Sequence, residues 1–546
     1  MNVATHLACR AAAEPGRAAL HVPTRRGHAT VTFADLHAES DALAHGLSRR
    51  GVTRGVRVAV MVPPSRPFFA VTFALLKLAA VPVLIDPGMG LTGLGRCLTE
   101  AEPAAFVGVP KAHAARRLFG WARRSVTLTV NAGPGRFFCH ASTAELITAG
   151  RTARPFAMPP VAATDTAAVL FTSGSTGPAK GVVYMHGTFT AQVELLKRVY
   201  GIEPGEVDLC TFPLFALFSP ALGMTCVVPR MDPTRPAQAD PRVLIDQANE
   251  FGVTNFFGSP AVLRNWAAAT VPPVPTLRRV ISAGAPATAA VIAAVAERLP
   301  AGAEVFTPYG ATEALPVANV GSRELADTRT ATEAGHGVCV GRPVPGMTVR
   351  VIAQSAEPIA AWDEALALPT GQIGEFVVRG PVATREYFRR PEATRLAKIP
   401  DPVTHEVWHR MGDVGYFDDR GRMWFCGRKA HVVWTAAGPL YPDQIEPVLD
   451  LTAGVVRTAL VGVTRGGATH PVVCFERDPA GVNSKAVVNA WARLAERSAA
   501  FPHTRPVTEF LEHPRFPVDV RHNSKIFREK LAAWADRKLG PNWRPA

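Results

Sequence analysis

A loop rich in glycine and hydroxyl residues, closed by a lysine, is the segment of this sequence with the clearest chemistry. It follows the apolar run 167–171, which is typical of a buried strand, and reads Thr172-Ser173-Gly174-Ser175-Thr176-Gly177-Pro178-Ala179-Lys180-Gly181. Glycines let backbone N–H groups converge on an anion, and hydroxyl groups donate further hydrogen bonds to phosphate oxygens. Lys180 adds a full positive charge. The segment therefore predicts a loop that binds the phosphates of a nucleotide.

Two better-known glycine patterns explain the sequence less well. The P-loop pattern G-x-x-x-x-G-K-[ST] would need glycine at 179 and a hydroxyl residue at 181, where this chain has Ala179 and Gly181. The segment 88–93 spells the dinucleotide fingerprint G-x-G-x-x-G. No clean βαβ unit with an acidic residue about 20 positions further on supports that fingerprint, so nicotinamide or flavin binding is the weaker alternative.

Together with four other stretches in the same order, the loop resembles the phosphate loop of the adenylate-forming superfamily. That superfamily includes acyl-CoA synthetases, luciferases and peptide-synthetase adenylation domains. The other stretches are 281–286 (ISAGAP), 309–313 (YGATE), 408–416 with 427–429 (WHRMGDVGY and GRK), and 523–528 (NSKIFR). The chain departs from the family pattern at Met411, where threonine is common, and at Ser524, where glycine is common.

The resemblance implies an ATP site. The implied nucleotide-binding residues are Thr172, Ser173, Gly174, Ser175, Thr176, Gly177, Gly284, Ala285, Pro286, Tyr309, Gly310, Asp413 and Arg428. Within this set, 284–286 would line the adenine and Tyr309 would pack against it. Asp413 would accept hydrogen bonds from both ribose hydroxyls, and Arg428 would reach the ribose or a phosphate.

The implied catalytic residues are Lys525, Glu313, Thr312 and Lys180. Glu313 is the expected magnesium ligand, because Mg²⁺ prefers oxygen ligands and bridges a carboxylate to phosphates. Thr312 would donate to the α-phosphate. Lys525 would neutralise the substrate carboxylate and the α-phosphate as they meet to form an acyl-adenylate.

The hinge stretch after Arg428 bears on what attacks the adenylate. Thioester-forming members commonly read G-R-x-x-D-x-I-K-x-x-G, whereas this chain has His431 in place of the aspartate, Trp434 in place of the lysine, and Gly438 one residue late. Because that loop forms part of the thiol tunnel in coenzyme A ligases, the departures indicate an acceptor other than coenzyme A. Phenylalanines in 211–220 and at 256–257 indicate a pocket for a long alkyl chain, with aromatic core packing as an equally good explanation.

The sequence segments 85–90, 309–317 and 408–413 are most similar to one branch of the superfamily. That branch is the ATP-dependent β-lactone synthetases of bacterial long-chain olefin biosynthesis. This resemblance implies a 2-alkyl-3-hydroxy acid whose own hydroxyl displaces AMP, because a tethered nucleophile has a high effective molarity. His186 or His431 could deprotonate that hydroxyl, although a histidine in a loop more often packs or caps. The branch also implies an assembly with a thiolase-like condensing enzyme, a reductase and a β-lactone decarboxylase.

Two other functions stay open at this point. One is a long-chain fatty acid ligase that delivers acyl groups to coenzyme A or a carrier protein. The other is a noncatalytic acyl- or adenylate-binding subunit, against which the complete set of charged motif residues argues.

Composition limits the class of protein. A chain of 546 residues is too long for one ordinary hydrophobic core, so two or more domains are expected. The net charge is +14, but the arginines are spread along the chain without interleaved aromatic residues, which argues against nucleic-acid binding. No apolar run reaches the roughly 18 residues of a membrane helix, and the N-terminus lacks a signal-peptide pattern. Eight scattered cysteines without metal-ligand spacing favour the reducing cytoplasm and give no support for zinc.

Apolar runs that alternate with Ala/Leu-rich stretches predict an α/β fold with parallel-rich sheets. We expect a large N-terminal body over 1–426 and a small, mobile α+β lid over 427–546. Helices are predicted over 32–51, 68–80, 486–499 and 527–537, and strands over 56–60, 81–85 and within 457–477. The Gly- and Pro-rich stretch 131–160 predicts a surface crossing.

Overall fold

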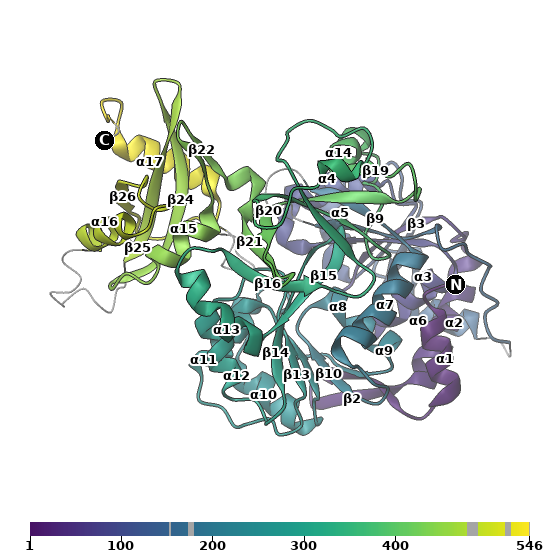
Figure 1. Ribbon diagram of the computed structural model, residues 1–546. Coiled ribbons are helices and arrows are strands. Elements are labelled where there is room, and N and C mark those ends of the chain that lie inside the picture. Colours follow the sequence, from purple (N-terminus) through teal and green to yellow (C-terminus); the bar gives the residue numbers. More distant parts are fainter. Residues whose placement is uncertain (152–153, 173–178, 478–489, 519–525, 545–546) are drawn as a thin grey trace.

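Two large sheets with helices packed around them form most of the chain, and a smaller sheet with its own helices lies at one end (Figure 1). The computed structural model describes residues 1–151, 154–172, 179–477, 490–518 and 526–544. The predicted α/β class, with a large body and a small C-terminal unit, is confirmed.

The first sheet carries the strand that leads into the predicted phosphate loop. Its order is β7-β6-β5-β3-β4-β8-β9, parallel throughout except for the antiparallel pair β8–β9. The strands are β3 (Arg57–Met61), β4 (Val81–Ile85), β5 (Ala105–Gly108), β6 (Leu128–Asn131), β7 (Ala141–Ser142), β8 (Thr166–Thr172) and β9 (Lys180–Met185). The helices between these strands are α3 (Arg66–Lys77), α4 (Gly90–Ala101), α5 (Pro110–Leu118) and α6 (Thr143–Gly150), while α2 (Phe33–Ser48) precedes β3 and α7 (His186–Tyr200) follows β9.

The second sheet changes character at β14. From β1 and β11 to β14 its neighbours run parallel, and beyond β14 they run antiparallel in the order β14-β15-β16-β21-β20-β18-β17. The parallel part, with the β2 edge, contains β1 (Ala18–Thr24), β2 (Gly27–Thr32), β10 (Val207–Cys210), β11 (Thr225–Val227), β12 (Asn255–Phe257), β13 (Arg279–Ile281) and β14 (Glu304–Ala311). The antiparallel part contains β15 (Ala314–Gly321), β16 (Val338–Pro343), β17 (Thr348–Ile352), β18 (Gly374–Arg379), β19 (Lys398–Pro400), β20 (Val407–Phe417) and β21 (Met423–Arg428).

Helices between these strands cover the second sheet and lead into the site region. They are α8 (Pro213–Ala216), α9 (Phe218–Leu222), α10 (Pro241–Glu250), α11 (Pro260–Ala268), α12 (Ala289–Ala296), α13 (Ser322–Glu333) and α14 (Pro391–Ala397). None of the helices in the described ranges is both long enough and apolar enough to cross a membrane.

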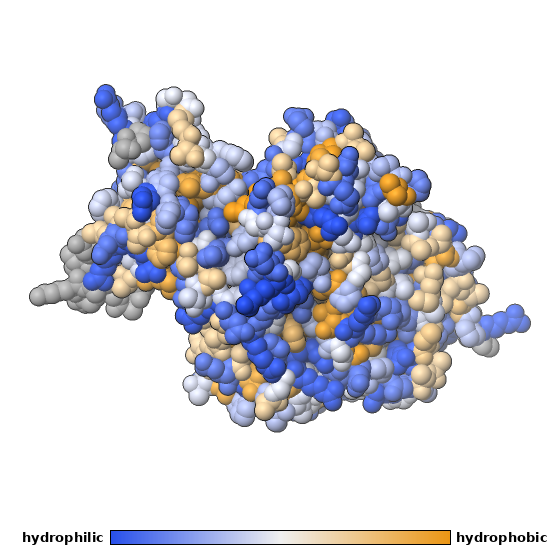
Figure 2. Space-filling view, viewed as in Figure 1, coloured by the Kyte–Doolittle hydropathy of each residue, from blue (hydrophilic) through white to orange (hydrophobic). Residues whose placement is uncertain are grey.

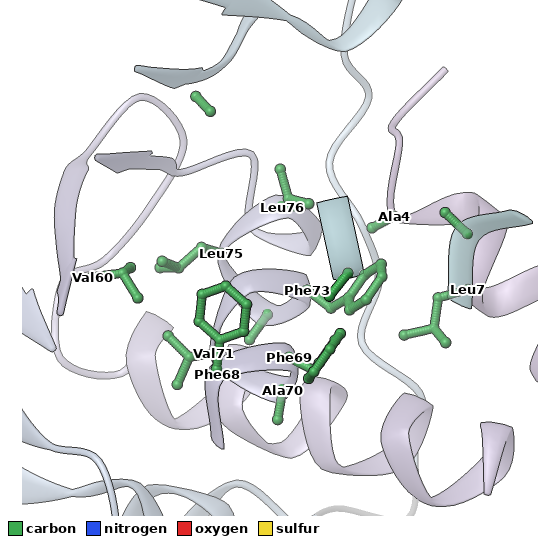
Figure 3. Packing of buried hydrophobic residues seen from close by; sticks show 14 of the residues in the cluster. Ala4, Leu7, Val60, Phe68, Phe69, Ala70, Val71, Phe73, Leu75 and Leu76 are labelled. Atoms are coloured by element: carbon green, nitrogen blue, oxygen red, sulfur yellow. The ribbon is translucent and has the colours of Figure 1, made fainter. Parts of the chain in front are cut away.

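Helix α3 shows why the interior holds together. Ten of its twelve residues are buried, and Phe68, Phe69 and Phe73 belong to the largest hydrophobic cluster, with Leu7 of α1 (Thr5–Ala13) in the same cluster. Figure 3 shows these rings packed side by side with the aliphatic residues around them. Burying one such side chain stabilises the fold by about 1.5–3 kcal/mol. The body therefore has a rigid interior on which to place a site.

The C-terminal unit has a separate three-stranded sheet, β24-β25-β26, made of β24 (Val455–Arg465), β25 (Ala468–Arg477) and β26 (Glu509–Glu512). The helices α15 (Pro442–Leu449), α16 (Ala490–Ala500) and α17 (Arg528–Leu539) pack on it and share two hydrophobic clusters with its strands. A two-stranded ribbon, β22 (Val433–Thr435) and β23 (Gly438–Leu440), precedes them. In Figure 1 this unit stands beside the β20–β21 end of the body.

Most predicted elements are present. The helix expected over 32–51 is α2, which Thr32 and Asp35 begin with a capping box, and the one expected over 68–80 is α3. The predicted surface crossing 131–160 is wrong in part, because it contains α6, whose first turn is held by a capping box between Ser142 and Glu145.

Candidate active site

The turn Thr312-Glu313 lies at the centre of the site and joins β14 to β15. Ala311 pairs with Ala314 across it, so the hairpin is as tight as two residues allow. Gly310 has to be glycine, because a Cβ there would lie 2.6 Å from the Ala314 carbonyl oxygen. The Tyr184 hydroxyl of β9 donates to the Thr312 carbonyl at 2.5 Å, which ties the turn to the first sheet.

Two further side chains hold Glu313. The Tyr387 hydroxyl donates to Oε1 at 2.6 Å, and the Thr384 backbone N–H and Oγ1 donate to the Glu313 carbonyl at 2.7 and 3.0 Å. Burial, with the neighbouring Glu313 carboxylate, holds the pKa of Tyr387 far above its ordinary value, so this hydroxyl remains a donor. Tyr387 and Thr384 are site residues that sequence reasoning missed.

Two lysines, Lys180 and Lys398, lie near the Tyr387 ring. Lys180, which pairs in register with Thr172 at the start of β9, places Nζ 4.8 Å from the centre of the Tyr387 ring. Lys398 is buried and donates to the Thr384 carbonyl at 2.5 Å. Burial lowers the pKa of Lys398 to about 7, against the opposing attraction of Glu313. The predicted Lys180 and Glu313 are therefore brought to one place.

Two of the residues predicted to bind the nucleotide, Asp413 and Arg428, lie opposite each other on the neighbouring antiparallel strands β20 and β21. An Arg428 guanidinium nitrogen lies 2.9 Å from Asp413 Oδ1, and the Tyr309 hydroxyl donates to Oδ2 at 2.7 Å. Burial raises the pKa of Asp413, and Arg428 and Tyr309 oppose that shift. The three predicted residues Tyr309, Asp413 and Arg428 form one connected group.

The predicted adenine turn follows β13 directly. Gly284 has φ of +94°, a left-handed conformation that favours glycine, and Ala285 and Pro286 follow it in a loop. Ala283, just before it, lines a small apolar cavity of about 50 Å³.

Several of the phenylalanines on which the alkyl-pocket prediction rests line that cavity. Phe215, Phe218 and Phe257 line it, together with Leu315 next to the Glu313 turn. Phe256 instead packs against Trp266 in the core, as the explanation by core packing expects. The alkyl pocket stays a prediction. At one wall the buried Asp208 accepts hydrogen bonds from Ser219 and Asn255. Figure 2 shows hydrophobic residues in the middle of the visible face, among hydrophilic ones.

The two candidate histidines lie in different places. His186 begins α7 with its ring against the backbone N–H of Val3, and burial lowers its pKa to about 4. The structure thus places it with the N-terminal segment. His431 lies just after β21, and its pKa is lowered to about 4 by burial and by the charges of Arg528 and Arg428. The charge of Arg428, a residue of the predicted nucleotide site, therefore acts on His431.

Several predicted residues lie outside the described ranges: Ser173, Gly174, Ser175, Thr176, Gly177 and Lys525. The strands that flank the first five are β8 and β9. Lys525 directly precedes Ile526, which bridges to Val518 in the C-terminal unit.

Glu313 fits a magnesium ion bound mainly through phosphates. In the described parts of the chain no three His, Cys, Asp or Glu side chains cluster as a metal site, and Tyr387 is bonded to only one of the two Glu313 carboxylate oxygens. Mg²⁺ usually keeps several waters and is held by one or two carboxylates plus substrate phosphates. A single carboxylate, bonded to a tyrosine whose ring lies 4.8 Å from Lys180 Nζ, suits that mode. A dedicated all-protein metal cage does not occur in the described residues.

Comparison with known proteins shows what the chain is similar to. Residues 7–388 match the family described as AMP-binding enzyme. Two curated relatives named olefin beta-lactone synthetase, from Stenotrophomonas maltophilia and Xanthomonas campestris pv. campestris, are 50% and 49% identical to this chain. The first alignment covers 98% of both chains, and the second covers 98% of this chain and 97% of the relative.

Among solved structures, the amide bond synthetase McbA from Marinactinospora thermotolerans is similar with a TM-score of 0.78 at 23% identity. The alignment covers 97% of this chain and 99% of McbA, and at that identity it shows a shared fold. The resemblance predicted from the motifs is confirmed: the chain belongs to the AMP-binding, adenylate-forming enzyme family.

Proposed function

We propose that this protein activates a long-chain 2-alkyl-3-hydroxy acid with ATP and closes it to a β-lactone, releasing AMP and pyrophosphate, in bacterial olefin biosynthesis. The observation that carries the proposal is the identity of about half of all residues, over nearly the whole chain, to two relatives named olefin beta-lactone synthetase. The connected group Tyr309–Asp413–Arg428 beside the Glu313 turn supports it. ATP binding is a property of the family, and Mg²⁺ is part of the proposal.

The first half-reaction joins the substrate carboxylate to the α-phosphate of ATP. Asp413 and Arg428 are the residues that would hold the ribose, and residues 284–286 with Tyr309 would line the adenine. Thr312 and Lys180 would donate to the phosphates, with Thr172, Gly310 and residues 173–177 of the loop. Glu313 would hold Mg²⁺, which neutralises phosphate charge when bound. Lys525 would compensate the two negative charges that approach each other.

The second half-reaction needs no second substrate. The 3-hydroxyl oxygen attacks the acyl carbon of the adenylate, the bond to the phosphate oxygen breaks, and AMP leaves while the hydroxyl proton passes to a base. Because the nucleophile is part of the same molecule, effective molarity replaces the binding of a thiol. The hinge residues His431 and Trp434, which differ from the thioester-forming pattern, are consistent with this acceptor, and Trp434 is more than half exposed.

The proposal also assigns separate roles to the N-terminal body and the C-terminal unit. Residues 1–426 would form the body that binds ATP and acid, and residues 427–546 a mobile lid that brings Lys525 to the reaction. All eight cysteines, each in the described ranges, are free thiols, in keeping with a cytoplasmic location. We further infer an assembly with the reductase and the β-lactone decarboxylase that act before and after this step.

One incubation tests the reaction. The protein is mixed with ATP, Mg²⁺ and a synthetic 2-alkyl-3-hydroxy acid, without coenzyme A, and the products are read by proton NMR. We expect a β-lactone with one AMP per product. If AMP and an acyl product form only after a thiol is added, the protein is instead a long-chain acid ligase. Absence of pyrophosphate release under every condition would indicate a noncatalytic binding subunit.

A further inference from the structure

A cavity of about 710 Å³ lies behind the Glu313 turn and has no part in the reaction described above. Residues 385–398 supply most of its wall, and residues 358–360, Pro400 and Val407 complete it. Tyr387 and Lys398 are its buried members, each about 5% exposed, whereas Arg385 and Arg389 are exposed. The cavity thus leads from an arginine-bearing surface inward to the back of the active site.

The charges that line this cavity are mostly positive. Four arginines and one lysine line it, against the single carboxylate of Glu386. Three of the arginines are already neutralised by ion pairs: Arg389 with Glu102, Arg390 with Glu100, and Arg395 with Glu392. Arg385 and Lys398 form no ion pair with any described residue. Two cations in the wall therefore lack an ion-pair partner among the described residues, although the Glu313 carboxylate attracts the Lys398 ammonium group from beyond ion-pair distance.

Of the two cations, Lys398 is the stronger indication of an anion site, because it is buried. Its ammonium group donates to the Thr384 carbonyl and, at 3.2 Å, to Thr384 Oγ1, both of which are uncharged acceptors. A buried charge is strongly disfavoured unless an opposite charge compensates it. An anion that enters the cavity would supply that compensation, with Arg385 able to approach it from the exposed side.

The position of Tyr387 identifies the anion. Its hydroxyl donates to Glu313, the proposed magnesium ligand, and its ring lies 4.8 Å from Lys180 Nζ and 5.8 Å from Lys398 Nζ. One side chain therefore contacts both the triphosphate side of the active site and the cavity. The anion released on that side of the site is pyrophosphate, whose several negative charges suit two cations that have no ion-pair partner among the described residues.

We propose that this cavity is a second anion site, in which Lys398 and Arg385 receive the pyrophosphate released by adenylation before it passes to solvent. The inference rests on the proposed function for the identity of its ligand. No bond forms or breaks in this step, because the phosphoanhydride has already been cleaved and the dissociated pyrophosphate only changes position.

The test measures binding rather than turnover. The full-length protein is saturated with α,β-methylene ATP, which fills the nucleotide site and cannot be cleaved there, and is then titrated with pyrophosphate by calorimetry. We expect one further pyrophosphate to bind per chain. Arg385→Ala and Lys398→Met should each weaken that binding at least about tenfold, and Arg385→Ala should leave the affinity for the analogue within about twofold.

Arg124→Ala is the matched control, since Arg124 is an exposed arginine outside the cavity and should bind pyrophosphate as the wild type does. Arg385 is exposed, so its variant is expected to fold even if Lys398→Met does not. The site is overturned if no pyrophosphate binds in the presence of the analogue, or if Arg385→Ala binds it with unchanged affinity.

Failure of this inference and failure of the proposed function give different results. A protein that forms AMP from the hydroxy acid but binds no second pyrophosphate overturns the cavity site alone. A protein that binds the second pyrophosphate in an Arg385-dependent manner but forms no AMP supports the anion site and overturns the proposed reaction.

Discussion

Among single residues, Lys525 should have the largest effect on rate. We expect Lys525→Ala to lower the rate of pyrophosphate release by about 10²–10³-fold, the usual size of a lost electrostatic contact to a transition state. ATP affinity should change little, because the lysine acts where carboxylate and α-phosphate meet. Rapid-quench assays and equilibrium ATP binding measure the two quantities. Lys530→Ala, at an exposed lysine of α17, is the control, and unchanged pyrophosphate release in the Lys525 variant would remove that residue from the reaction.

Tyr387→Phe isolates the hydrogen bond that orients Glu313. The ring stays in place, but the 2.6 Å bond to Oε1 is lost. Since the carboxylate is then free to turn, we expect about five- to tenfold more Mg²⁺ to be needed for half-maximal AMP formation, with maximal rate less affected. A magnesium titration measures this. Tyr416→Phe removes a hydroxyl bonded to the His336 carbonyl and should leave the magnesium dependence unchanged, as should Tyr387→Phe if Glu313 is not the ligand.

Asp208 gives the fold a pH dependence with a definite sign. Burial raises its pKa to about 6, against the hydrogen bonds from Ser219 and Asn255. Between about pH 4 and 6 the folded chain holds a proton that the unfolded chain has lost, so this group's contribution to stability falls as pH rises through that range. Asp208→Asn should therefore gain stability relative to wild type by about 1–3 kcal/mol between pH 5 and pH 8.

Thermal unfolding of the wild type and of Asp208→Asn at both pH values measures this difference. Asp246→Asn, at an exposed carboxylate of α10, is the control and should track the wild type at both. A melting-temperature difference between Asp208→Asn and wild type that does not change with pH would contradict the prediction.

Among the elements, the β14–β15 hairpin makes the strictest demand on its sequence. Gly310→Ala would place a methyl group 2.6 Å from the Ala314 carbonyl oxygen and 2.8 Å from Leu315 Cδ1. The backbone must move, so the Glu313 turn shifts. Overpacking of this kind costs about 1–3 kcal/mol, and a displaced catalytic group lowers rate by about 10²-fold. We expect both a lower melting temperature and a lower kcat. Gly16→Ala, where no atom lies within 4 Å, should behave as wild type; if Gly310→Ala does too, the hairpin tolerates movement.

The elements also show what could be predicted from sequence. Runs such as β4, α2 and β8 follow from local periodicity, and the motif residues Tyr309, Asp413 and Arg428 were predicted by resemblance. Helix α6 was missed although its capping box was present, because the Gly- and Pro-rich composition of the whole stretch outweighed one local signal.

The contacts that complete the site could not be predicted, because they join distant parts of the chain. Tyr387 is 74 positions from Glu313, and it reaches the site because residues 182 and 387 form a bridge between a strand of the first sheet and the segment after β18. No periodicity encodes such a pairing. Lys398 is likewise an ordinary lysine in sequence, and only its burial distinguishes it.

For the whole molecule, the net charge of +14 should act on substrate capture. A positive field raises the encounter rate of a polyanion such as ATP, and salt screens it over about 10 Å at 0.1 M ionic strength. Between 0.05 and 0.5 M KCl we expect kcat/KM for ATP to fall about three- to tenfold, with kcat changed less than twofold, because bound groups in the buried Asp413 cluster are screened far less than the approaching nucleotide. Repeating the series with potassium acetate separates screening from competition by chloride. A decrease in kcat as large as that in kcat/KM would place the effect of salt on the folded site itself, since steering alters arrival and not the steps that follow it.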